Sequence, residues 1–200
     1  MAGPPPLRRA IEELFEASIR AKRVFLEENA AALERAVELV ASALGSGHKI
    51  VLFGNGGSAA DAQHIAAEFV GRFLRERKPL PAIALTTDTS ALTAIANDYG
   101  YDDVFARQVQ ALGASGDVAL AISTSGKSPS VLRAVEACRQ IGMGTIGLTG
   151  GDGGALGGMV DLCLRVSASR ESARIQETHI LVGHVICELV DRRLFGPSGG

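Results

Sequence analysis

Five short apolar runs, separated by helical or glycine-rich segments, constrain the fold of this chain more than any other feature. Each run is apolar without a period of two, which is typical of parallel strands that helices cover on both faces. The alternation of runs and helical segments predicts a doubly wound α/β sheet with right-handed crossover connections. The expected strands are Ile50–Phe53, Ala82–Leu85, Val118–Ile122, Thr145–Leu148 and Leu162–Val166.

Helical segments flank these runs at both ends of the chain. Apolar residues recur at helical spacing from Leu7 to Leu44, and we expect one long or broken helix there that ends at Gly45. A second helix is expected over Glu171–Leu194. Because this helix is apolar nearly all round between Ile180 and Val190, we expect the domain and another subunit to bury it together.

Length and composition limit the possible classes of protein. With 200 residues, 46% of them hydrophobic, the chain suits a single domain (1–200), with an N-terminal helical segment (1–47) before an α/β core and C-terminal helix (48–195). A net charge of -2 provides no basic surface for nucleic acid. The 3 cysteines are expected to be reduced core thiols. Without an apolar leader or a run of about 18 apolar residues, we expect a cytoplasmic protein that does not bind membranes.

The loop after the first expected strand reads Gly54-Asn55-Gly56-Gly57-Ser58 and lies at the sheet edge where open α/β sheets bind ligands. Its glycines let backbone N–H groups turn toward an anion. Ser58 is expected to cap the following helix and to offer its hydroxyl, with Asp61 at capping-box spacing. Neither GxGxxG nor the Walker lysine pattern is present, so an ordinary strand-to-helix turn is the alternative.

The loop after the third expected strand is dense in hydroxyl groups and reads Ser123-Thr124-Ser125-Gly126-Lys127-Ser128-Pro129. Ser128 followed by Pro129 predicts a helix N-cap with proline at the first helical position. Hydroxyls and the free N–H groups of a helix N-terminus can bind a phosphate dianion without arginine. Two such loops on one edge of the sheet favour a phosphate site over ordinary polar loops.

Ionisable side chains form a stripe on the helix that follows the first loop, at spacings of three, four and four. The stripe consists of Asp61, His64, Glu68 and Arg72. Within it, His64 and Glu68 could share one ion or one proton. The alternative is a solvated pair on a helix surface.

The C-terminal helix carries Gln176 and His184, eight residues apart and therefore about 80° apart around the helix axis. They share a side of the helix only broadly. A histidine inside an apolar stretch can equally be a core histidine with a satisfied hydrogen bond. Spacing alone does not decide between these interpretations.

Four longer segments occur in order over nearly the whole chain: Gly54–Glu68, Ala84–Tyr101, Ile122–Pro129 and Arg174–His184. Together they resemble the SIS-domain phosphoheptose isomerases, which interconvert sedoheptulose 7-phosphate and D-glycero-D-manno-heptose 7-phosphate at the first step of ADP-heptose supply for the lipopolysaccharide core. The resemblance implies a five-stranded parallel sheet flanked by helices. It also implies a homotetramer whose active sites are shared between subunits, with the N-terminal helix as an assembly element.

The resemblance further implies roles for single residues. Glu68 would be the base that moves a proton between C1 and C2 through an enediol, His184 would serve the oxygens as acid and base, and Arg72 would orient Glu68. Ala173 stands where some members carry an acidic residue, so any role of a carboxylate there is lost. The expected substrate-binding residues are Asn55, Gly56, Gly57, Ser58, Arg72, Asn97, Asp98, Ser123, Thr124, Ser125, Ser128 and Gln176. The expected zinc ligands, for one ion per subunit, are His64, Glu68, Gln176 and His184.

Two other functions are compatible with this fold. A non-enzymatic relative binds the bacterial replication initiator DnaA, and Ala82–Asp88, Ile95–Tyr99 and Ala173–Glu177 resemble it nearly as well. Asp61 and the sequence Lys127-Ser128-Pro129 favour the isomerase. A sugar-phosphate-sensing regulator is disfavoured, because the chain has no room for a separate DNA-binding domain.

Overall fold

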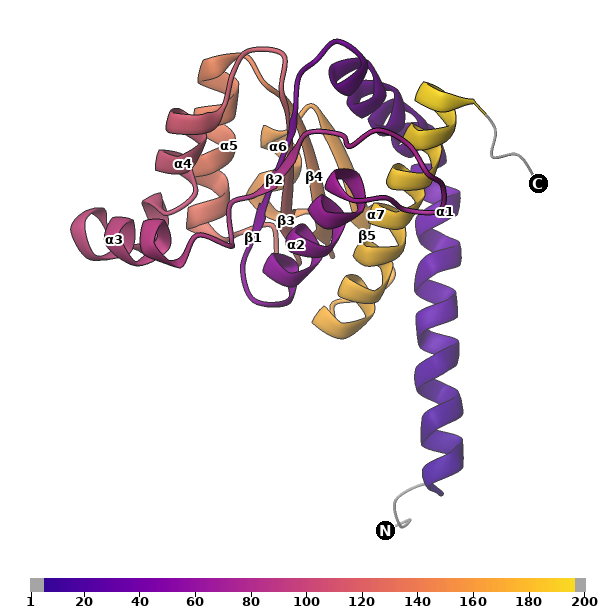
Figure 1. Cartoon of the computed structure of the whole chain (residues 1–200). Coiled ribbons are helices and arrows are strands. Elements are labelled where there is room, and N and C mark those ends of the chain that lie inside the picture. Colours follow the sequence, from indigo (N-terminus) through magenta and orange to yellow (C-terminus); the bar gives the residue numbers. More distant parts are fainter. Residues whose placement is uncertain (1–5, 197–200) are drawn as a thin grey trace.

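The computed structural model describes residues 6–196 and contains one five-stranded parallel sheet in the order β2-β1-β3-β4-β5 (Figure 1). Each predicted strand is confirmed to within two residues at either end, and the predicted parallel doubly wound arrangement is confirmed as well. The strands are β1 (Ile50–Gly54), β2 (Ala82–Ala84), β3 (Val118–Ser123), β4 (Gly144–Gly150) and β5 (Leu162–Val166).

Helices cover both faces of the sheet. Ile50 and Leu52 of β1 face one apolar core under α1, α2 and α7, whereas Val51 and Phe53 face a second core under α4, α5 and α6. Because both faces are buried, the strands need apolar residues at every position, which explains the absence of a period of two. The helices are α1 (Leu7–Gly45), α2 (Gly57–Val70), α3 (Thr89–Tyr99), α4 (Ala106–Leu112), α5 (Pro129–Ile141), α6 (Gly154–Met159) and α7 (Ser172–Phe195), with a 3₁₀ turn η1 at Tyr101–Asp103.

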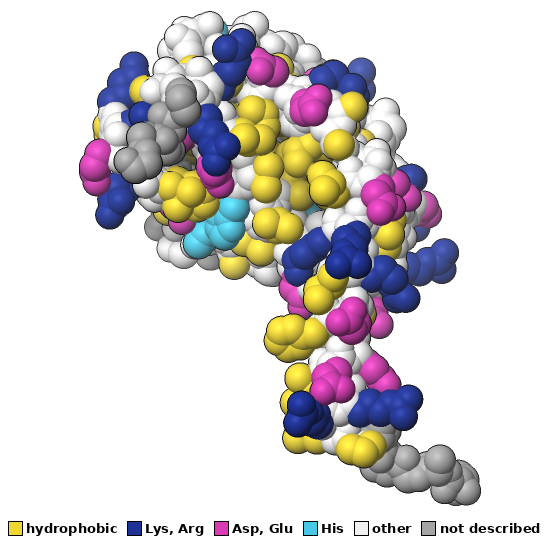
Figure 2. All heavy atoms as spheres, turned by 90° about the vertical axis from the view of Figure 1, so that its right-hand side faces the viewer, with side chains coloured by type: hydrophobic (Ala, Val, Ile, Leu, Met, Phe, Trp, Pro, Cys, Tyr) yellow, Lys and Arg dark blue, Asp and Glu magenta, His cyan; other side chains and the backbone are white. Residues whose placement is uncertain are grey.

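Helix α1 is one unbroken helix of 39 residues, which is roughly 58 Å long. Its C-terminal half packs on α7 and β5, and its N-terminal half projects away from the rest of the molecule (Figure 1). Figure 2 shows hydrophobic side chains along this projecting part and on the neighbouring face of the molecule. The exposed apolar residues of the projecting part are Leu7, Ile11, Leu14, Phe15 and Ile19. A contiguous exposed apolar surface of this kind is typical of a segment that packs against another chain.

Helix α7 begins and ends within one residue of its predicted bounds. It packs against α1 on one side and α2 on the other, so the expected burial on more than one side is largely met within one chain. Leu181 is the exception, because 41% of its surface remains exposed. Between residues 6 and 196, no helix is both long and apolar enough to span a membrane.

Asn29 on α1 completes the hydrogen bonding of the edge strand β5. Its side-chain Oδ1 accepts a hydrogen bond from the backbone N–H of Arg165 at 3.1 Å. Its Nδ2 donates to the backbone C=O of Arg165 at 3.2 Å and of Phe25 at 2.9 Å. The buried amide therefore takes the place that a further strand would occupy and protects the edge from pairing with another chain.

We predict that Asn29→Ala lowers the free energy of unfolding by about 1–3 kcal/mol, because it leaves a backbone donor and acceptor of β5 without partners. Denaturant titration followed by circular dichroism measures this change. Glu38→Gln on the same helix is the control, since its ion pair with Arg193 leaves 60% and 63% of the two side chains exposed and should contribute less than about 1 kcal/mol. Equal losses in the two variants would contradict the role of Asn29.

Candidate active site

Helices α2 and α7 pack closely in the layer on one face of the sheet (Figure 1). A Cβ added to Gly183 would lie 2.4 Å from Cδ1 of Ile65, and a Cβ added to Gly57 would lie 2.4 Å from Nε2 of Gln176. A larger residue at either position would therefore require the side chain of Ile65 or Gln176 to move, so the two glycines let the helices pack closely with these side chains in place. Gly57 of α2 lies against Gln176 of α7, and further along both helices Ile65 lies against Gly183. The two helices therefore run parallel, and residue 64 lies opposite residue 184.

Three ionisable side chains meet where the two helices touch. Nε2 of His64 lies 2.9 Å from Nε2 of His184 and 3.3 Å from Oε1 of Glu68. The ring of Phe73 stacks on His184 with 5.4 Å between the ring centroids. Because two imidazole nitrogens face each other at hydrogen-bonding distance, one must donate a proton and the other must accept it. The cluster of His64, Glu68 and His184 can therefore hold one shared proton or one cation.

The same three side chains fit a zinc ion. Their donor atoms lie within 4.8 Å of one another. Two imidazole nitrogens and one carboxylate oxygen form a donor set of the catalytic zinc type, which leaves one position for water or substrate. Ligands bound at about 2.0–2.1 Å in a tetrahedral site lie about 3.3 Å apart, close to the distances of 2.9 Å and 3.3 Å from Nε2 of His64 to the donor atoms of His184 and Glu68.

Gln176, the fourth expected ligand, lies elsewhere. Its side chain rests on Gly57 at the start of α2, and its position on α7 is about 12 Å along the axis from His184. Within one chain it therefore belongs to the neighbourhood of the first loop rather than to the cluster of His64, Glu68 and His184.

Arg72 does not contact Glu68 in the chain. Helix α2 ends at Val70, so Arg72 lies beyond the helix and outside the predicted stripe. Its guanidinium forms an exposed ion pair with Glu76, with 3.0 Å between Nε and Oε1. The expectation that Arg72 orients Glu68 assumed two more helical residues than α2 has.

Asp61 is the remaining member of the stripe and lies one turn before His64. Burial raises the pKa of its carboxyl group, and the nearby His64 opposes this shift. Its Oδ2 is buried without a hydrogen-bond partner among the described residues. Asp61 is therefore partly buried near His64 but is not one of the three grouped donors.

The two loops are neighbours because β1 and β3 pair with each other, with Gly54 opposite Ile122. Asn55 joins the loops: its Nδ2 donates to the hydroxyl oxygens of Ser128 at 2.8 Å and Ser130 at 3.0 Å. Its Oδ1 accepts a hydrogen bond from the hydroxyl of Tyr101 at 2.8 Å. The prediction that both loops lie at one edge of the sheet is confirmed.

The predicted helix caps are only partly present. Helix α2 begins at Gly57 and its N-cap is Gly56, with a φ of 56° that favours glycine. Ser58 is already inside the helix, so the prediction that it caps α2 is wrong. Ser128 and Pro129 occupy the predicted N-cap and first helical positions of α5, but the Ser128 side chain does not cap the helix; it binds Asn55 instead.

A hollow of about 300 Å³ borders the hydroxyl-rich loop. Thr124 and Ser125 line it together with two cations, Lys127 and Arg170. Near these cations, the pKa of the Asp152 carboxyl is lowered, first by a hydrogen bond from the backbone N–H of Gly154 and then by the charges of Lys127 and Arg170. Arg170 was not expected at this loop from the sequence, because only the fold brings the residues before α7 to it.

Asn97 and Asp98 lie apart from these groups. They are exposed near the end of α3, where Nδ2 of Asn97 donates to Oδ1 of Asp98 at 2.8 Å. Helix α3 packs on the opposite face of the sheet from α2 and α7. In a single chain, the residues that the resemblance assigned to one site are thus distributed over separate places.

Comparison with known proteins identifies the family of the chain. A family model described as SIS domain matches residues 13–150. A phosphoheptose isomerase of Roseiflexus sp. (strain RS-1) is 60% identical over 94% of this chain and 94% of its own. The chain belongs to the SIS domain family, among its phosphoheptose isomerases. Solved phosphoheptose isomerases from Neisseria gonorrhoeae (48% identity, TM-score 0.87, covering 93% of this chain and 99% of that one) and Francisella tularensis (42%, 0.89, 94% and 99%) share its fold.

Membership of this family separates the alternatives left open by the sequence. The relatives named above carry isomerase names, so they give no support to the initiator-binding function. The sequence also left open whether His184 is a core histidine. In the structure the core histidine is His179, whereas His184 belongs to the cluster with His64 and Glu68. His179 is fully buried, and its Nε2 donates to the backbone C=O of Thr149 at 3.0 Å.

We predict that His179 makes this SIS-domain chain less stable in acid. Burial lowers the pKa of the His179 imidazole to about 4, against 6.5 for the free side chain, although the hydrogen bond to Thr149 opposes the shift. Below pH 6.5 the unfolded chain therefore binds the proton and the folded chain does not, so stability is complete above pH 6.5 and falls toward pH 4. The loss should reach roughly 3 kcal/mol.

Denaturant titrations between pH 4 and pH 7 measure this dependence. His179→Gln keeps a hydrogen-bond donor for the carbonyl of Thr149 but does not titrate. It should remove the share of the pH dependence of stability that residue 179 causes. His48→Gln is the control, because 39% of the His48 side chain is exposed and its removal should leave the dependence in place. An unchanged slope in His179→Gln would show that another group causes it.

Proposed function

We propose that the chain is an aldose–ketose isomerase that converts sedoheptulose 7-phosphate into D-glycero-D-manno-heptose 7-phosphate, the reaction by which the family resemblance connects it to ADP-heptose and the lipopolysaccharide core. The observation that carries the proposal is the cluster of His64, Glu68 and His184, of which His64 and Glu68 lie on the helix that begins at the first of the two proposed phosphate-binding loops. The identity with proteins named phosphoheptose isomerase, 60% for the relative from Roseiflexus, supports the same reaction.

Glu68 is the proposed base. A carboxylate can take a proton from C1 or C2 and return it to the other carbon, which an enediol mechanism requires. Its side chain is only 22% exposed, and partial exclusion of water favours return of the same proton. His184, whose Nε2 lies 2.9 Å from Nε2 of His64, is the proposed acid and base for the two oxygens.

The loops are the proposed phosphate site. The N-termini of α2 and α5 both follow strand ends at this edge, and their free N–H groups favour an anion. Hydroxyls of Ser58, Ser123, Thr124, Ser125 and Ser128 add donors, and Asn55 would contact the sugar hydroxyls. Lys127 and Arg170 beside the hollow add positive charge. Such a site binds a dianion through several preorganised donors.

We also propose that the cluster of His64, Glu68 and His184 binds one zinc ion per chain. When bound, zinc would polarise the carbonyl and enediolate oxygens of the sugar. Glu68, His64 and His184 would then hold the ion. Because these residues lie on α2 and α7, the sugar chain would extend from them toward the loops.

A homotetramer with shared active sites is the proposed assembly. The exposed apolar side chains of the projecting half of α1 would lose contact with water only against other chains. In one chain, Gln176, Asn97 and Asp98 lie apart from the cluster of His64, Glu68 and His184. Sites built from two or more chains would allow these separate groups to meet one substrate.

We predict that Glu68→Gln lowers turnover of sedoheptulose 7-phosphate at least about tenfold, because the amide keeps the shape of the side chain and loses its basicity. NMR detection of the aldose product measures the reaction. Glu188→Gln on α7 is the control, since Glu188 pairs with the exposed Arg192 and lies outside the cluster. Turnover above about a tenth of the wild-type value in Glu68→Gln would remove Glu68 from the role of base.

Metal analysis of protein prepared without chelator should find about one zinc per chain, and His64→Ala should lose it, because two of the three donors cannot hold the ion alone. His48→Ala should retain the metal, since His48 lies beside Asp117 and far from the cluster. Zinc-free wild-type protein with full turnover would contradict a role for the metal and leave the three side chains as acid and base groups.

A further inference from the structure

One ion pair in the molecule is shielded from water on both sides. Nε of Arg77 lies 2.9 Å from Oδ1 of Asp191, and the two side chains are 2% and 4% exposed. No other ion pair between residues 6 and 196 has both side chains so deeply buried. The burial is complete within a single chain, so the pair does not depend on assembly.

Arg77 holds the end of α2 that carries Glu68. Its Nη2 donates to the backbone C=O of Glu68 at 2.8 Å, and its Nη1 donates to the C=O of Phe69 at 2.8 Å and of Gly71 at 2.9 Å. The last carbonyls of a helix have no partners inside it, and a cation there is favoured by the helix dipole. The guanidinium is therefore the C-terminal cap of α2 and bonds directly to the backbone of the proposed base.

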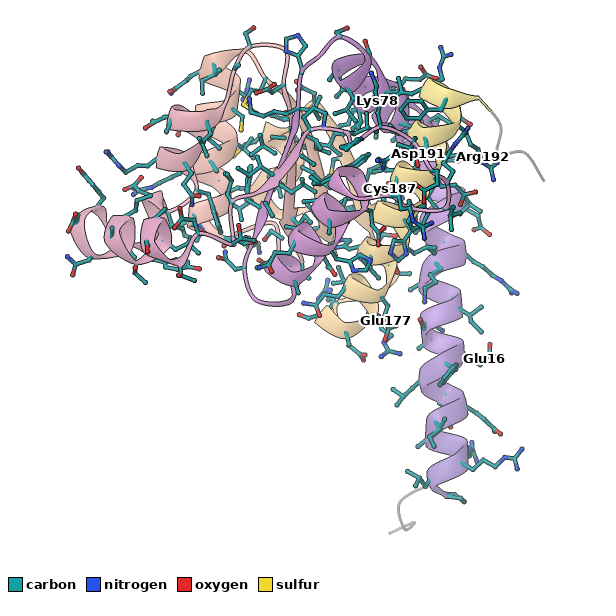
Figure 3. The ribbon with its side chains drawn as sticks, in the orientation of Figure 1. Glu16, Lys78, Glu177, Cys187, Asp191 and Arg192 are labelled. Carbon is teal, nitrogen blue, oxygen red and sulfur yellow. The ribbon has the colours of Figure 1, made fainter. Side chains whose placement is uncertain are left out.

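Asp191 belongs to the helix that carries His184. The two residues are seven positions apart on α7, about two turns, and so lie on one face of the helix. Between them, Cys187 is buried, and burial followed by the charges of Glu68 and Asp191 raises the pKa of its thiol. Figure 3 shows Cys187 and Asp191 in succession on α7, with Lys78, the neighbour of Arg77 in sequence, near the same end of the helix.

We propose that Arg77 and Asp191 are positioning residues that fix Glu68 of α2 relative to His184 of α7. The inference rests on the proposed function of these two residues. The guanidinium of Arg77 bonds to the backbone of Glu68 on α2 and to Asp191, which lies on the same face of α7 as His184. A shift of either helix would therefore break a buried charge-assisted hydrogen bond. Proton transfer requires that the base and the acid stay at nearly fixed distances from the substrate. A displacement of about 1 Å can lower the rate substantially.

Arg75 provides a matched comparison in the same segment. Its Nη2 donates to the backbone C=O of Phe195 at 3.1 Å, and its Nη1 donates to that of Gly196. Arg75 therefore caps the C-terminus of α7 in the way that Arg77 caps α2. It has no hydrogen bond to α2 and no ion pair with Asp191, so its loss should affect stability without moving Glu68.

Arg77→Lys keeps the charge next to Asp191 but cannot bind four carbonyls, those of Glu68, Phe69, Gly71 and Lys78, and a carboxylate together. In the full-length protein we expect it to lower kcat for sedoheptulose 7-phosphate at least about tenfold with KM changed less than about twofold, since the loops are untouched. Arg75→Lys should leave both constants within about twofold of the wild type. Equal effects of the two variants on kcat, or a change in KM alone, would overturn the positioning role.

A second readout does not depend on the reaction. At fixed pH, the imidazole NMR signals of His64 and His184 should shift in Arg77→Lys and stay in place in Arg75→Lys, whereas the His48 signal should not move in either. If wild-type protein fails to turn over the sugar phosphate, the proposed function is wrong, and the imidazole signals still test the positioning. Unmoved His64 and His184 signals in Arg77→Lys would overturn it.

If Arg77→Lys fails to fold, the double variant Arg77→Met with Asp191→Leu decides the question. It removes both charges and fills the space with apolar side chains, which folded proteins often tolerate. We expect a folded protein with displaced His64 and His184 signals and the same loss of kcat. Wild-type signals and turnover in the folded double variant would show that the pair has no positioning role.

Discussion

The close packing of α2 on α7 is the constraint on which the candidate active site depends. Gly57 and Gly183 leave room for the side chains of Gln176 and Ile65, and a larger side chain at either glycine would require these side chains to move. Because protein interiors are close-packed, such a change would disturb the contact between the two helices. The contact between His64 and His184 exists only while these helices keep their distance.

The sheet supplies the second half of the site. In the order β2-β1-β3-β4-β5, the chain turns to opposite sides after β1 and β3, so the crevice between their carboxyl ends is the switch point at which such sheets bind ligands. The two loops leave the sheet there, and Asn55 connects them. Helix α2 starts at the first loop and carries His64 and Glu68 away from it, so one helix joins the proposed phosphate site to the proposed acid–base groups.

Polar groups outside the site are arranged to remain fixed and neutral or paired. His179 stays uncharged in the core with one hydrogen bond to Thr149, whereas His184, five residues later, lies in a partly exposed cluster with Glu68. The buried charges of Arg77 and Asp191 neutralise each other. His64, Glu68 and His184, in contrast, lie together with their donor atoms within 4.8 Å of one another.

The sequence by itself determined the five parallel strands, the two terminal helices and the loops of the site, because hydrophobic period, glycine and proline act locally. It misplaced the cap at Ser58 and the partner of Arg72, since the exact start and end of α2 follow from the turn at Gly56 and the cap by Arg77. Only the tertiary structure decided that His64, Glu68 and His184 meet while Gln176 lies apart. Spacing fixes angles on one helix, but which helices touch, and at which residues, depends on packing between segments more than one hundred residues apart.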